Sequence, residues 1–313
     1  MFSHDCGIAE AASVSSFRPS DGHHRNMIMV GEDMRTWFIT GGTPGGFGLA
    51  YAEAALDAGD RVVLTARRVE RLKEWAQAYG DRVLVLPLDV TDDQQVIDSV
   101  RAAEGHFGAV DVLVNNAGRG WYGSIEGMAD DAVRQMFELN FFAVLSVTRA
   151  VLPGMRARRR GWIINMSSVA GLRGVTGFGY YSASKFAVEA VTEVLRNEVE
   201  PLGIRVMAVE PGAFRTRAYA GFADEAVDET IAEYQPMLQD VRSAMIDQDG
   251  KQPGDPQRGA RAVIAAMAQA SPPHRLVLGS GAFDVVVKTI EENLADIRNS
   301  EALSRRADFP ATV

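Results

Sequence analysis

Short apolar runs rich in β-branched residues alternate with amphipathic segments along the chain from residue 35 onward. The runs that predict strands are Thr36–Thr40, Arg61–Thr65, Val83–Leu88, Val110–Val114, Trp162–Met166, Ile204–Val209 and Leu276–Leu278. Helical spacing predicts helices over Phe47–Ala58, Val69–Tyr79, Asp92–His106, Asp130–Arg158, Tyr180–Val199, Pro256–Ala270 and Ala282–Arg298. Strand and helix alternate through short connections, which implies parallel pairing. The sequence therefore predicts an α/β fold, a doubly wound parallel sheet of about seven strands with helices on both faces.

The ends of this pattern divide the chain into a leader and one folded region. Residues 1–34 show no periodicity and are rich in Ser, Gly, His and Asp, so we expect a disordered leader there. Residues 35–313 are expected to form a single domain. Within it, residues 217–252 scatter aromatic and Met side chains among acids. We expect this segment to fold over the site as a lid, although apolar residues at helical spacing there are equally consistent with core packing.

Composition excludes several classes of function. A net charge of -9, with no long basic stripe to offset it, argues against nucleic-acid binding. The only cysteine is Cys6, which excludes an internal disulfide and a cysteine-based zinc site and fits a reducing cytoplasm. No uncharged apolar stretch of about 18 residues is evident, so we expect no membrane span. The composition therefore favours a cytoplasmic protein without a cysteine-bound metal.

A glycine-rich turn joins the first predicted strand to the first helix, with the sequence Thr40-Gly41-Gly42-Thr43-Pro44-Gly45-Gly46-Phe47-Gly48. Glycines allow a sharp turn and a close approach to a pyrophosphate, which the amides at the start of the following helix then face. A glycine turn alone is a weak signal, but its place between an apolar strand and a helix is typical of dinucleotide binding.

The end of the second strand points to the kind of dinucleotide. An acidic residue about 20 positions after such a turn reads the ribose hydroxyl of NAD. Here the strand ends in Arg67 and Arg68, with no acid. A guanidinium matches a 2'-phosphate in charge and geometry, so we expect NADP rather than NAD. Either arginine, and Arg68 in particular, is also consistent with a solvated charge that begins the next helix.

Tyr181 and Lys185 lie four residues apart in the segment that predicts a long amphipathic helix. On a helix they share one face, so the phenol and the ammonium are expected to be neighbours. A nearby cation should lower the pKa of the phenol from about 10 toward neutrality. The pair is therefore suited to move a proton on and off a substrate oxygen. Taken alone, a Tyr and a Lys at this spacing are more often an ordinary surface pair.

Together with Asn115-Asn116-Ala117-Gly118, these motifs resemble the short-chain dehydrogenase/reductase family. The resemblance covers residues 36–216 closely and the rest loosely, and it implies a Rossmann-like NAD(P)-binding domain. The family's Thr-Gly-x-x-x-Gly-x-Gly spacing is met by Gly42, Gly46 and Gly48 only if Gly41 takes the Thr position. Counted from Thr40, the turn is one residue too long.

The resemblance also assigns roles. The catalytic set that it implies is Asn140, Ser168, Tyr181 and Lys185. Ser168 is chosen over Ser167 because it lies thirteen residues before Tyr181, as in the family, and Asn140 would hold a water through its helix backbone. Asp89 would accept from the adenine amino group, although Asp89 and Thr91 also suit a turn or N-cap. The implied cofactor set is Gly42, Gly46, Phe47, Gly48, Arg67, Arg68, Asp89, Val90, Asn116, Ala117, Gly118, Tyr181, Lys185, Pro211, Gly212, Phe214 and Thr216.

These observations lead to one hypothesis and two alternatives. The leading hypothesis is an NADP-dependent oxidoreductase that interconverts a carbonyl and a primary or secondary alcohol. A nucleotide-binding regulatory protein with vestigial activity is the first alternative, favoured only by the irregular glycine turn. A sugar-nucleotide epimerase or dehydratase is the second. The resemblance also implies a homodimer or homotetramer, paired through the helices predicted over Asp130–Arg158 and Tyr180–Val199.

Overall fold

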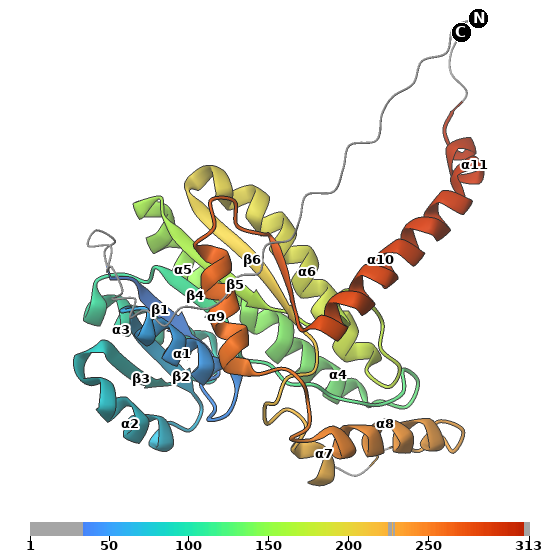
Figure 1. Cartoon of the computed structure of the whole chain (residues 1–313), viewed down its shortest axis with the longest axis horizontal. Helices are drawn as coiled ribbons and strands as arrows, with labels where there is room; N and C mark the ends of the chain where they lie inside the picture. The colour runs from blue at the N-terminus through green and yellow to red at the C-terminus, as the bar shows by residue number, and fades with distance from the viewer. Residues whose placement is uncertain (1–33, 225–226, 228, 310–313) are drawn as a thin grey trace, which may run out of the picture. The chain divides into compact units, whose positions relative to one another are not determined.

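A computed structural model describes residues 34–224, 227 and 229–309, so the leader expected at residues 1–34 lies outside the described residues except for Met34. Seven parallel strands form one sheet in the order β3-β2-β1-β4-β5-β6-β7 (Figure 1). Their bounds are β1 Thr36–Ile39, β2 Arg61–Ala66, β3 Val83–Pro87, β4 Val112–Asn115, β5 Gly161–Met166, β6 Ile204–Pro211 and β7 Arg275–Leu278. The predicted doubly wound parallel sheet is confirmed.

The central strands are apolar throughout because both faces of the sheet are covered. In β1, Trp37 and Ile39 pack into one core while Phe38 packs into the other, and all three are fully buried. In β2, Leu64 and Val63 follow the same alternation. A strand buried on both faces has no polar side to show in the sequence, so it is recognised as a continuous apolar run.

Helices form the two covering layers. Their bounds are α1 Phe47–Asp57, α2 Glu70–Ala76, α3 Asp93–Phe107, α4 Asp130–Phe137, α5 Ala143–Arg158, α6 Gly179–Val199, α7 Gly221–Asp224, α8 Gln235–Gln248, α9 Pro256–Met267, α10 Ser280–Asn299 and α11 Glu301–Ser304. The core on one face is built with α1 and α9, and the core on the other with α3, α5 and α6. The sheet is thus the middle layer of three.

The segment predicted as one helix over Asp130–Arg158 contains a π-helical turn, η2 (Glu138–Phe142), between α4 and α5. By length and composition this stretch is apolar enough to cross a membrane, which corrects the expectation that no such stretch exists. Its residues Val147, Val151 and Met155 pack into the core beside the sheet. A buried core helix passes the same test, so this finding is weak evidence for a membrane span.

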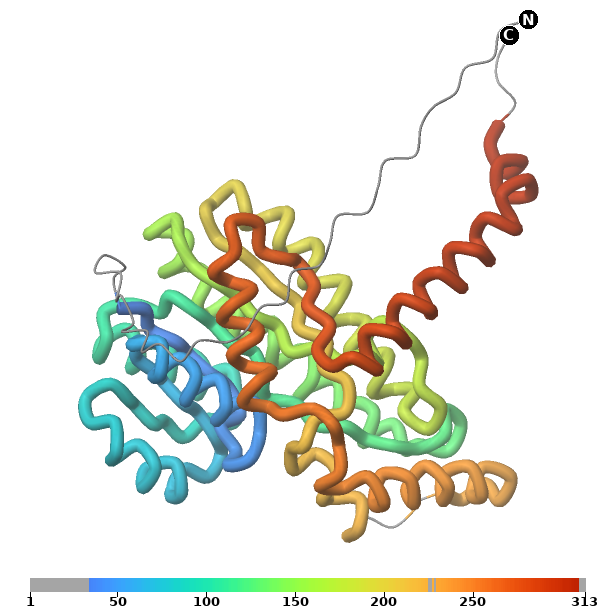
Figure 2. The backbone as a smooth tube through the Cα atoms, in the orientation of Figure 1, coloured from blue at the N-terminus to red at the C-terminus, as the bar shows by residue number. Residues whose placement is uncertain are grey.

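The C-terminal part of the described chain differs from the layered body. Between β6 and α9, residues 217–252 include α7 and α8, where a lid is expected. After β7, α10 begins beside the sheet edge and then runs away from it (Figure 2).

Candidate active site

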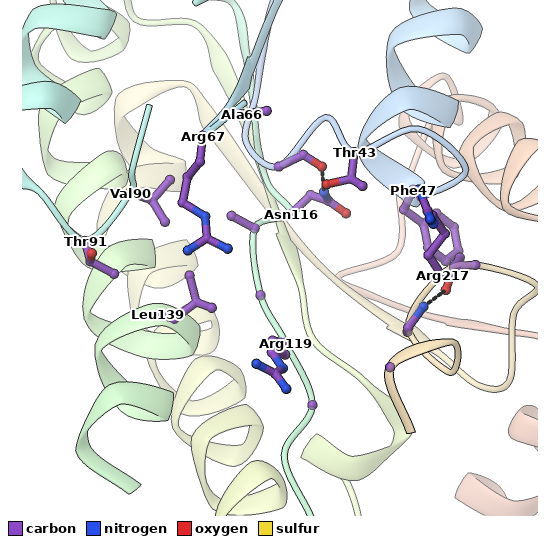
Figure 3. Close-up of a pocket in the computed structure, with 18 of the residues that line it drawn as sticks. Thr43, Phe47, Ala66, Arg67, Val90, Thr91, Asn116, Arg119, Leu139 and Arg217 are labelled. Atoms are coloured by element: carbon purple, nitrogen blue, oxygen red, sulfur yellow. Dashed lines mark hydrogen bonds between the residues drawn. The ribbon is translucent and has the colours of Figure 1, made fainter. Parts of the chain in front are cut away.

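A cavity of about 960 Å³ lies at the carboxyl ends of the strands. In the sheet, β2 and β3 lie on one side of β1, and β4 lies on the other side. The loops that follow β1 and β4 therefore diverge and leave a crevice, as in other open α/β sheets. Figure 3 shows the side chains around it, with Arg67 between Val90 and Asn116 and with Arg217 beside Phe47.

The glycine turn is held by the loop that follows β4. The hydroxyl oxygen of Thr40 accepts hydrogen bonds from the backbone N–H groups of Asn116 (2.9 Å) and Ala117 (3.0 Å). In return, the Asn116 amide donates to the carbonyls of Thr40 (2.8 Å) and Gly41 (3.0 Å). Gly41 has a φ of +75°, and a Cβ there would lie 2.9 Å from the Cα of Ala117. Only glycine fits at this position, because both the conformation and the space exclude a side chain.

These contacts bear on the register of the turn. Thr40 and Gly41 make the contacts with the Asn116 loop, and a Cβ on Gly48 would lie 2.4 Å from the Gly41 carbonyl oxygen. The extra residue is thus accommodated between Gly41 and Gly48. Gly41, Gly46 and Phe47 line the cavity, whereas Gly42 and Gly48 do not. A Cβ on Gly42 would instead meet the Leu64 side chain at 2.5 Å, which gives that glycine a packing reason.

The ends of β2 and β3 form one end of the cavity, with Arg67, Asp89 and Val90 in its wall. Arg67 and Arg68 are both exposed, but only Arg67 lines the cavity. An Asp89 oxygen accepts from the backbone N–H (3.0 Å) and the hydroxyl (2.7 Å) of Thr91. The turn role expected for Asp89 therefore coexists with its place in the wall. Helix α3 is capped by Asp92, whose side chain accepts a hydrogen bond from the Gln95 N–H.

Asn115 belongs to the core and joins three elements. Its amide donates to Thr148 of α5 (3.0 Å) and to Asn165 of β5 (2.8 Å), and the amide of Asn165 donates to Thr192 of α6 (2.9 Å). Buried amides are tolerated when they are bonded in this way. The Asn–Asn–Ala–Gly motif thus has one buried structural member, Asn115, and three members that line the cavity.

Asn140 is fully buried in the π turn. Its side chain accepts from the Arg119 N–H (2.9 Å) and donates to the Arg119 carbonyl (2.9 Å) and the Ser184 hydroxyl (3.2 Å). The bonds to Arg119 fix the loop after Gly118. A Cβ on Gly118 itself would lie 3.1 Å from the side-chain oxygen of Asn140. A π turn shifts the helical hydrogen bonds, and such turns are frequent at functional sites. The side chain thus holds the loop, while the backbone role that the resemblance implies remains a prediction.

Ser168, Tyr181 and Lys185 come together from the end of β5 and the first turns of α6. Ser168 hydrogen-bonds the Tyr181 phenol and accepts from the Ala170 N–H (3.1 Å). The Lys185 ammonium lies 5.9 Å from the centre of the Tyr181 ring and donates to the Met166 carbonyl (2.8 Å). The helical spacing predicted from the sequence therefore places phenol and ammonium on one face of α6.

The direction of the phenol pKa differs from expectation. Burial raises the pKa of Tyr181, and the hydrogen bond with Ser168 lowers it by less. Burial also lowers the pKa of Lys185 to about 8. Taking a charge out of water disfavours the charged form of either group, and burial is the largest cause of both pKa shifts. The expectation that Lys185 brings the Tyr181 pKa down is corrected: in this geometry the phenol is held protonated.

Behind Lys185 lies a charged cluster that the sequence analysis missed. Arg275 of β7 bonds Glu189 (2.7 Å) and Glu193 (3.1 Å) of α6 and lies 4.0 Å from Glu210 of β6. Glu210 is fully buried, and burial together with Glu189 raises its pKa to about 8. Glu189 lies one turn after Lys185 on the same face, which is the sequence signal that could have found it. Its charge favours the ammonium form of Lys185.

The chain after β6 approaches the other end of the cavity. Thr216 lines the cavity, but Pro211, Gly212 and Phe214 do not. Phe214 is buried and packs its ring 4.9 Å from that of Phe47, and Gly212 donates to the Leu278 carbonyl (3.0 Å). Of the four residues expected to meet the cofactor here, Thr216 alone lies in the wall, and the others order the turn behind it.

The expected lid reaches the cavity through Arg217, Ala218, Gly221 and Phe222. The Phe222 ring lies 5.1 Å from Tyr122 and 6.1 Å from Phe178, which in turn lies 6.3 Å from Tyr181. This aromatic group joins the lid to the catalytic phenol.

Hydrogen bonds fasten the same segment to the loop after β4. Ser124 donates to Glu229 (2.5 Å), and Tyr234 donates to Glu126 (2.9 Å). Tyr180, expected to line the pocket or core, donates to the Ile125 carbonyl (2.9 Å) and so holds this loop. Further wall residues that the sequence analysis missed are Arg119, Gln135, Glu138 and Leu139. They lie on loops and helix faces whose spacing carries no cavity signal.

Comparison with known proteins gives consistent matches. A family model described as short chain dehydrogenase matches residues 35–226. Oxidoreductase BOA17 of Botryotinia fuckeliana is 36% identical over 259 residues, which cover 82% of this chain and 93% of that protein. The 3-ketodihydrosphingosine reductase of Bacteroides thetaiotaomicron is 35% identical over 244 residues, which cover 76% of this chain and 86% of the reductase.

Solved structures agree in fold. A short-chain dehydrogenase from Streptomyces avermitilis has a TM-score of 0.81 and 39% identity, and the match covers 88% of this chain and 100% of that one. An alcohol dehydrogenase from Thermococcus sibiricus, complexed with 5-hydroxy-NADP, has a TM-score of 0.63 and 25% identity over 79% of this chain and 96% of its own. A Burkholderia phymatum structure in complex with NAD has a TM-score of 0.70 at 24% identity over 90% and 99%, which shows the fold.

Proposed function

The chain belongs to the short chain dehydrogenase family, whose members are NAD(P)-dependent oxidoreductases, and from this premise we propose that it interconverts a carbonyl and an alcohol with NADP. The observation that carries the proposal is the grouping of Ser168, Tyr181 and Lys185, with the hydroxyl bonded to the phenol and the ammonium one turn behind it. That grouping can hold a substrate oxygen and supply it with a proton.

The choice of NADP rests on the wall of the cavity. Arg67 lines it where β2 ends, and the described wall has no carboxylate directly after that strand. A guanidinium there favours a 2'-phosphate, which a carboxylate would repel. Gly41, Gly46 and Phe47 line the cavity at the turn, where a dinucleotide pyrophosphate binds in folds of this kind. When bound, the nicotinamide supplies or accepts the hydride.

The protein's own residues manage the oxygen and its proton. Ser168 donates a hydrogen bond to the substrate oxygen as negative charge develops on it. Tyr181 gives that oxygen its proton in carbonyl reduction and takes it back in alcohol oxidation. Lys185 provides a positive charge close to the phenol. Asn140 fixes the loop that the ammonium faces, since it bonds both backbone groups of Arg119.

The aromatic group around the phenol supports an apolar substrate. Tyr122, Phe178, Tyr219 and Phe222 form a series of ring contacts 5.1 to 6.4 Å apart, which reaches Tyr181 through Phe178 at 6.3 Å. Such walls favour a carbonyl next to a hydrocarbon group over one on a charged metabolite. A relative is named a 3-ketodihydrosphingosine reductase, which is consistent with this class.

Two adjacent tyrosines provide a matched test. The purified chain is assayed for NADPH and NADH oxidation with long-chain ketones, aromatic ketones and small charged ketoacids. We expect turnover with NADPH and an apolar ketone. Tyr181→Phe should lower turnover by about a thousandfold or more and leave NADPH binding, measured by fluorescence titration, nearly unchanged. Tyr180→Phe, which removes a bond to a loop carbonyl, should retain most turnover.

The outcomes are exclusive. Substantial turnover by Tyr181→Phe would refute the proposed chemistry. NADPH binding without turnover on any ketone or alcohol would favour the regulatory alternative instead.

A further inference from the structure

Helix α10 carries a row of exposed apolar side chains. Phe283, Val287, Ile290, Leu294 and Ile297, hereafter the α10 stripe, are 37 to 66% exposed. Val286, on the side of the helix next to the stripe, is buried. The helix runs outward from the sheet edge, so most of the stripe lies beyond the layered body (Figures 1 and 2). Large apolar side chains in a contiguous row on a protein surface mark an interaction site.

The spacing within the stripe indicates what kind of surface it fits. Its members are separated by four, three, four and three residues, an average of 3.5. A strict repeat of this kind makes a narrow seam that packs into the seam of another helix. A helix that lies against a broad core or in a lipid interface has a wider apolar face instead. The pattern therefore favours a partner helix.

Charge argues against a membrane as the partner. The side chains of α10 include the acids Asp284, Glu291, Glu292 and Asp296 but only two bases, Lys288 and Arg298. Helices that bind anionic lipid surfaces have the opposite balance, with Lys and Arg beside the apolar face. The whole chain also carries a net charge of -9. An acidic helix on an acidic protein would be repelled by such a surface.

The flanking charges select an orientation for a second copy of the same helix. Asp284 and Arg298 lie fourteen residues apart, two heptads, and so flank the same side of the stripe. If two copies pair antiparallel, Asp284 of each helix approaches Arg298 of the other, and this ion pair forms twice. If they pair parallel and in register, Arg298 instead lies opposite Asn293, and Asp284 has no basic neighbour. Antiparallel packing also opposes the helix dipoles favourably.

We propose that the α10 stripe is a self-association surface, on which two copies of this chain pair their α10 helices antiparallel. This surface is separate from α5 and α6, through which the family resemblance implies pairing. A two-fold axis would then pass near Glu291, where the repulsion of the two Glu291 carboxylates offsets part of the attraction of the two Asp284–Arg298 pairs. A seam of five apolar residues per chain is short, so association is expected to be weak and dependent on concentration.

The test measures mass in solution with the full-length chain. Analytical ultracentrifugation across about 1 to 100 µM should show a concentration-dependent association. Leu294→Lys places a charge in the seam and should halve the mass at high concentration, whatever other interface persists. Glu292→Lys changes charge on the outer side of the same helix and should leave the mass unchanged. Circular dichroism checks that both variants remain folded.

Charge exchange tests the orientation. Asp284→Arg and Arg298→Asp should each weaken association by about threefold to tenfold, because each places like charges together, and the double variant should restore it. A mass that Leu294→Lys leaves unchanged would overturn the proposal, as would a double variant weaker than either single one. Cosedimentation of the wild-type chain, but not of Leu294→Lys, with vesicles containing phosphatidylserine would assign the stripe to a membrane and also overturn it.

Discussion

The two ends of the candidate active site are built in different ways, and the cavity wall includes Arg67 but not Ser168, Tyr181 or Lys185. At the catalytic end, Ser168, Tyr181 and Lys185 are each held by neighbours, with burial deep enough to shift the pKa of both ionisable groups. At the opposite end, Arg67 is exposed on the loop after β2, and its guanidinium reaches into the cavity from one side. One end is fixed by the core, and the other is a side chain on a surface.

The difference teaches which property each end can control. A buried, bonded group has one orientation, so substitution there removes chemistry. An exposed side chain near a phosphate contributes affinity and cofactor preference but little to the fold. The catalytic end should therefore tolerate almost no change, and the arginine end should be adjustable. The following predictions test that contrast, beginning with the largest expected effect.

Ser168→Ala should lower turnover by about a hundredfold to a thousandfold, because it removes one donor to the developing oxyanion. The adjacent Ser167→Ala is the control and should change turnover by less than about threefold, since Ser167 is buried behind the site. Steady-state kinetics with saturating NADPH measure both. Equal losses in the two variants would remove Ser168 from the catalytic end.

The pH dependence of the two reaction directions should differ. Burial raises the pKa of Tyr181, so the phenol is protonated at neutral pH, as carbonyl reduction requires. Alcohol oxidation needs the phenolate, so its rate should rise by up to about tenfold per pH unit from pH 7 to 9, while reduction stays nearly level. Initial rates in both directions test this. An oxidation rate independent of pH over that range would contradict the raised pKa.

Arg67→Ala should weaken NADPH binding by about tenfold to a hundredfold, the effect of losing charge-assisted hydrogen bonds to a phosphate, and should leave NADH binding unchanged. Arg68→Ala is the matched control, since Arg68 does not line the cavity, and should change either affinity by less than about threefold. Fluorescence titrations measure all four constants. Equal effects on NADPH and NADH would mean that Arg67 does not distinguish the two.

Thr40→Val should lower the free energy of unfolding by about 2–3 kcal/mol, because two backbone N–H groups lose their acceptor. The control Thr43→Val, at an exposed position in the same turn, should cost about 0.5 kcal/mol or less. Urea denaturation monitored by circular dichroism compares them. Similar costs would show that the bonds between the turn and the Asn116 loop add little.

Glu210→Gln should stabilise the protein by about 1–2 kcal/mol more at pH 8 than at pH 5. The folded pKa of Glu210 is raised to about 8, above its unfolded value, so there is no cost of burying its charge when it is protonated in both states. That cost appears as pH rises from about 4.5 toward 8. Glu193→Gln, exposed on the same arginine, is the control and should show no such pH dependence. A pH-independent effect of Glu210→Gln would indicate a normal pKa.

The parallel sheet, the crevice and the pairing of Tyr181 with Lys185 could be predicted from the sequence alone. These follow from periodicity, because residues one helical turn apart share a face and buried strands have no polar side. The choice of Ser168 as the partner of Tyr181 came from the resemblance to the short-chain family, and the structure brings the two hydroxyls together at a strand end and a helix start.

Features that depend on burial and on distant partners could be seen only in the folded protein. The register of the glycine turn depends on Asn116, about 75 residues away, whose amide donates to the carbonyls of Thr40 and Gly41. The backbone of Ala117 leaves no space for a side chain at Gly41. Arg67 lines the cavity and Arg68 does not, which depends on how the loop after β2 is placed. The upward shift of the Tyr181 pKa depends on burial of the phenol. Desolvation is a property of the packed whole, so a local pattern does not determine its sign.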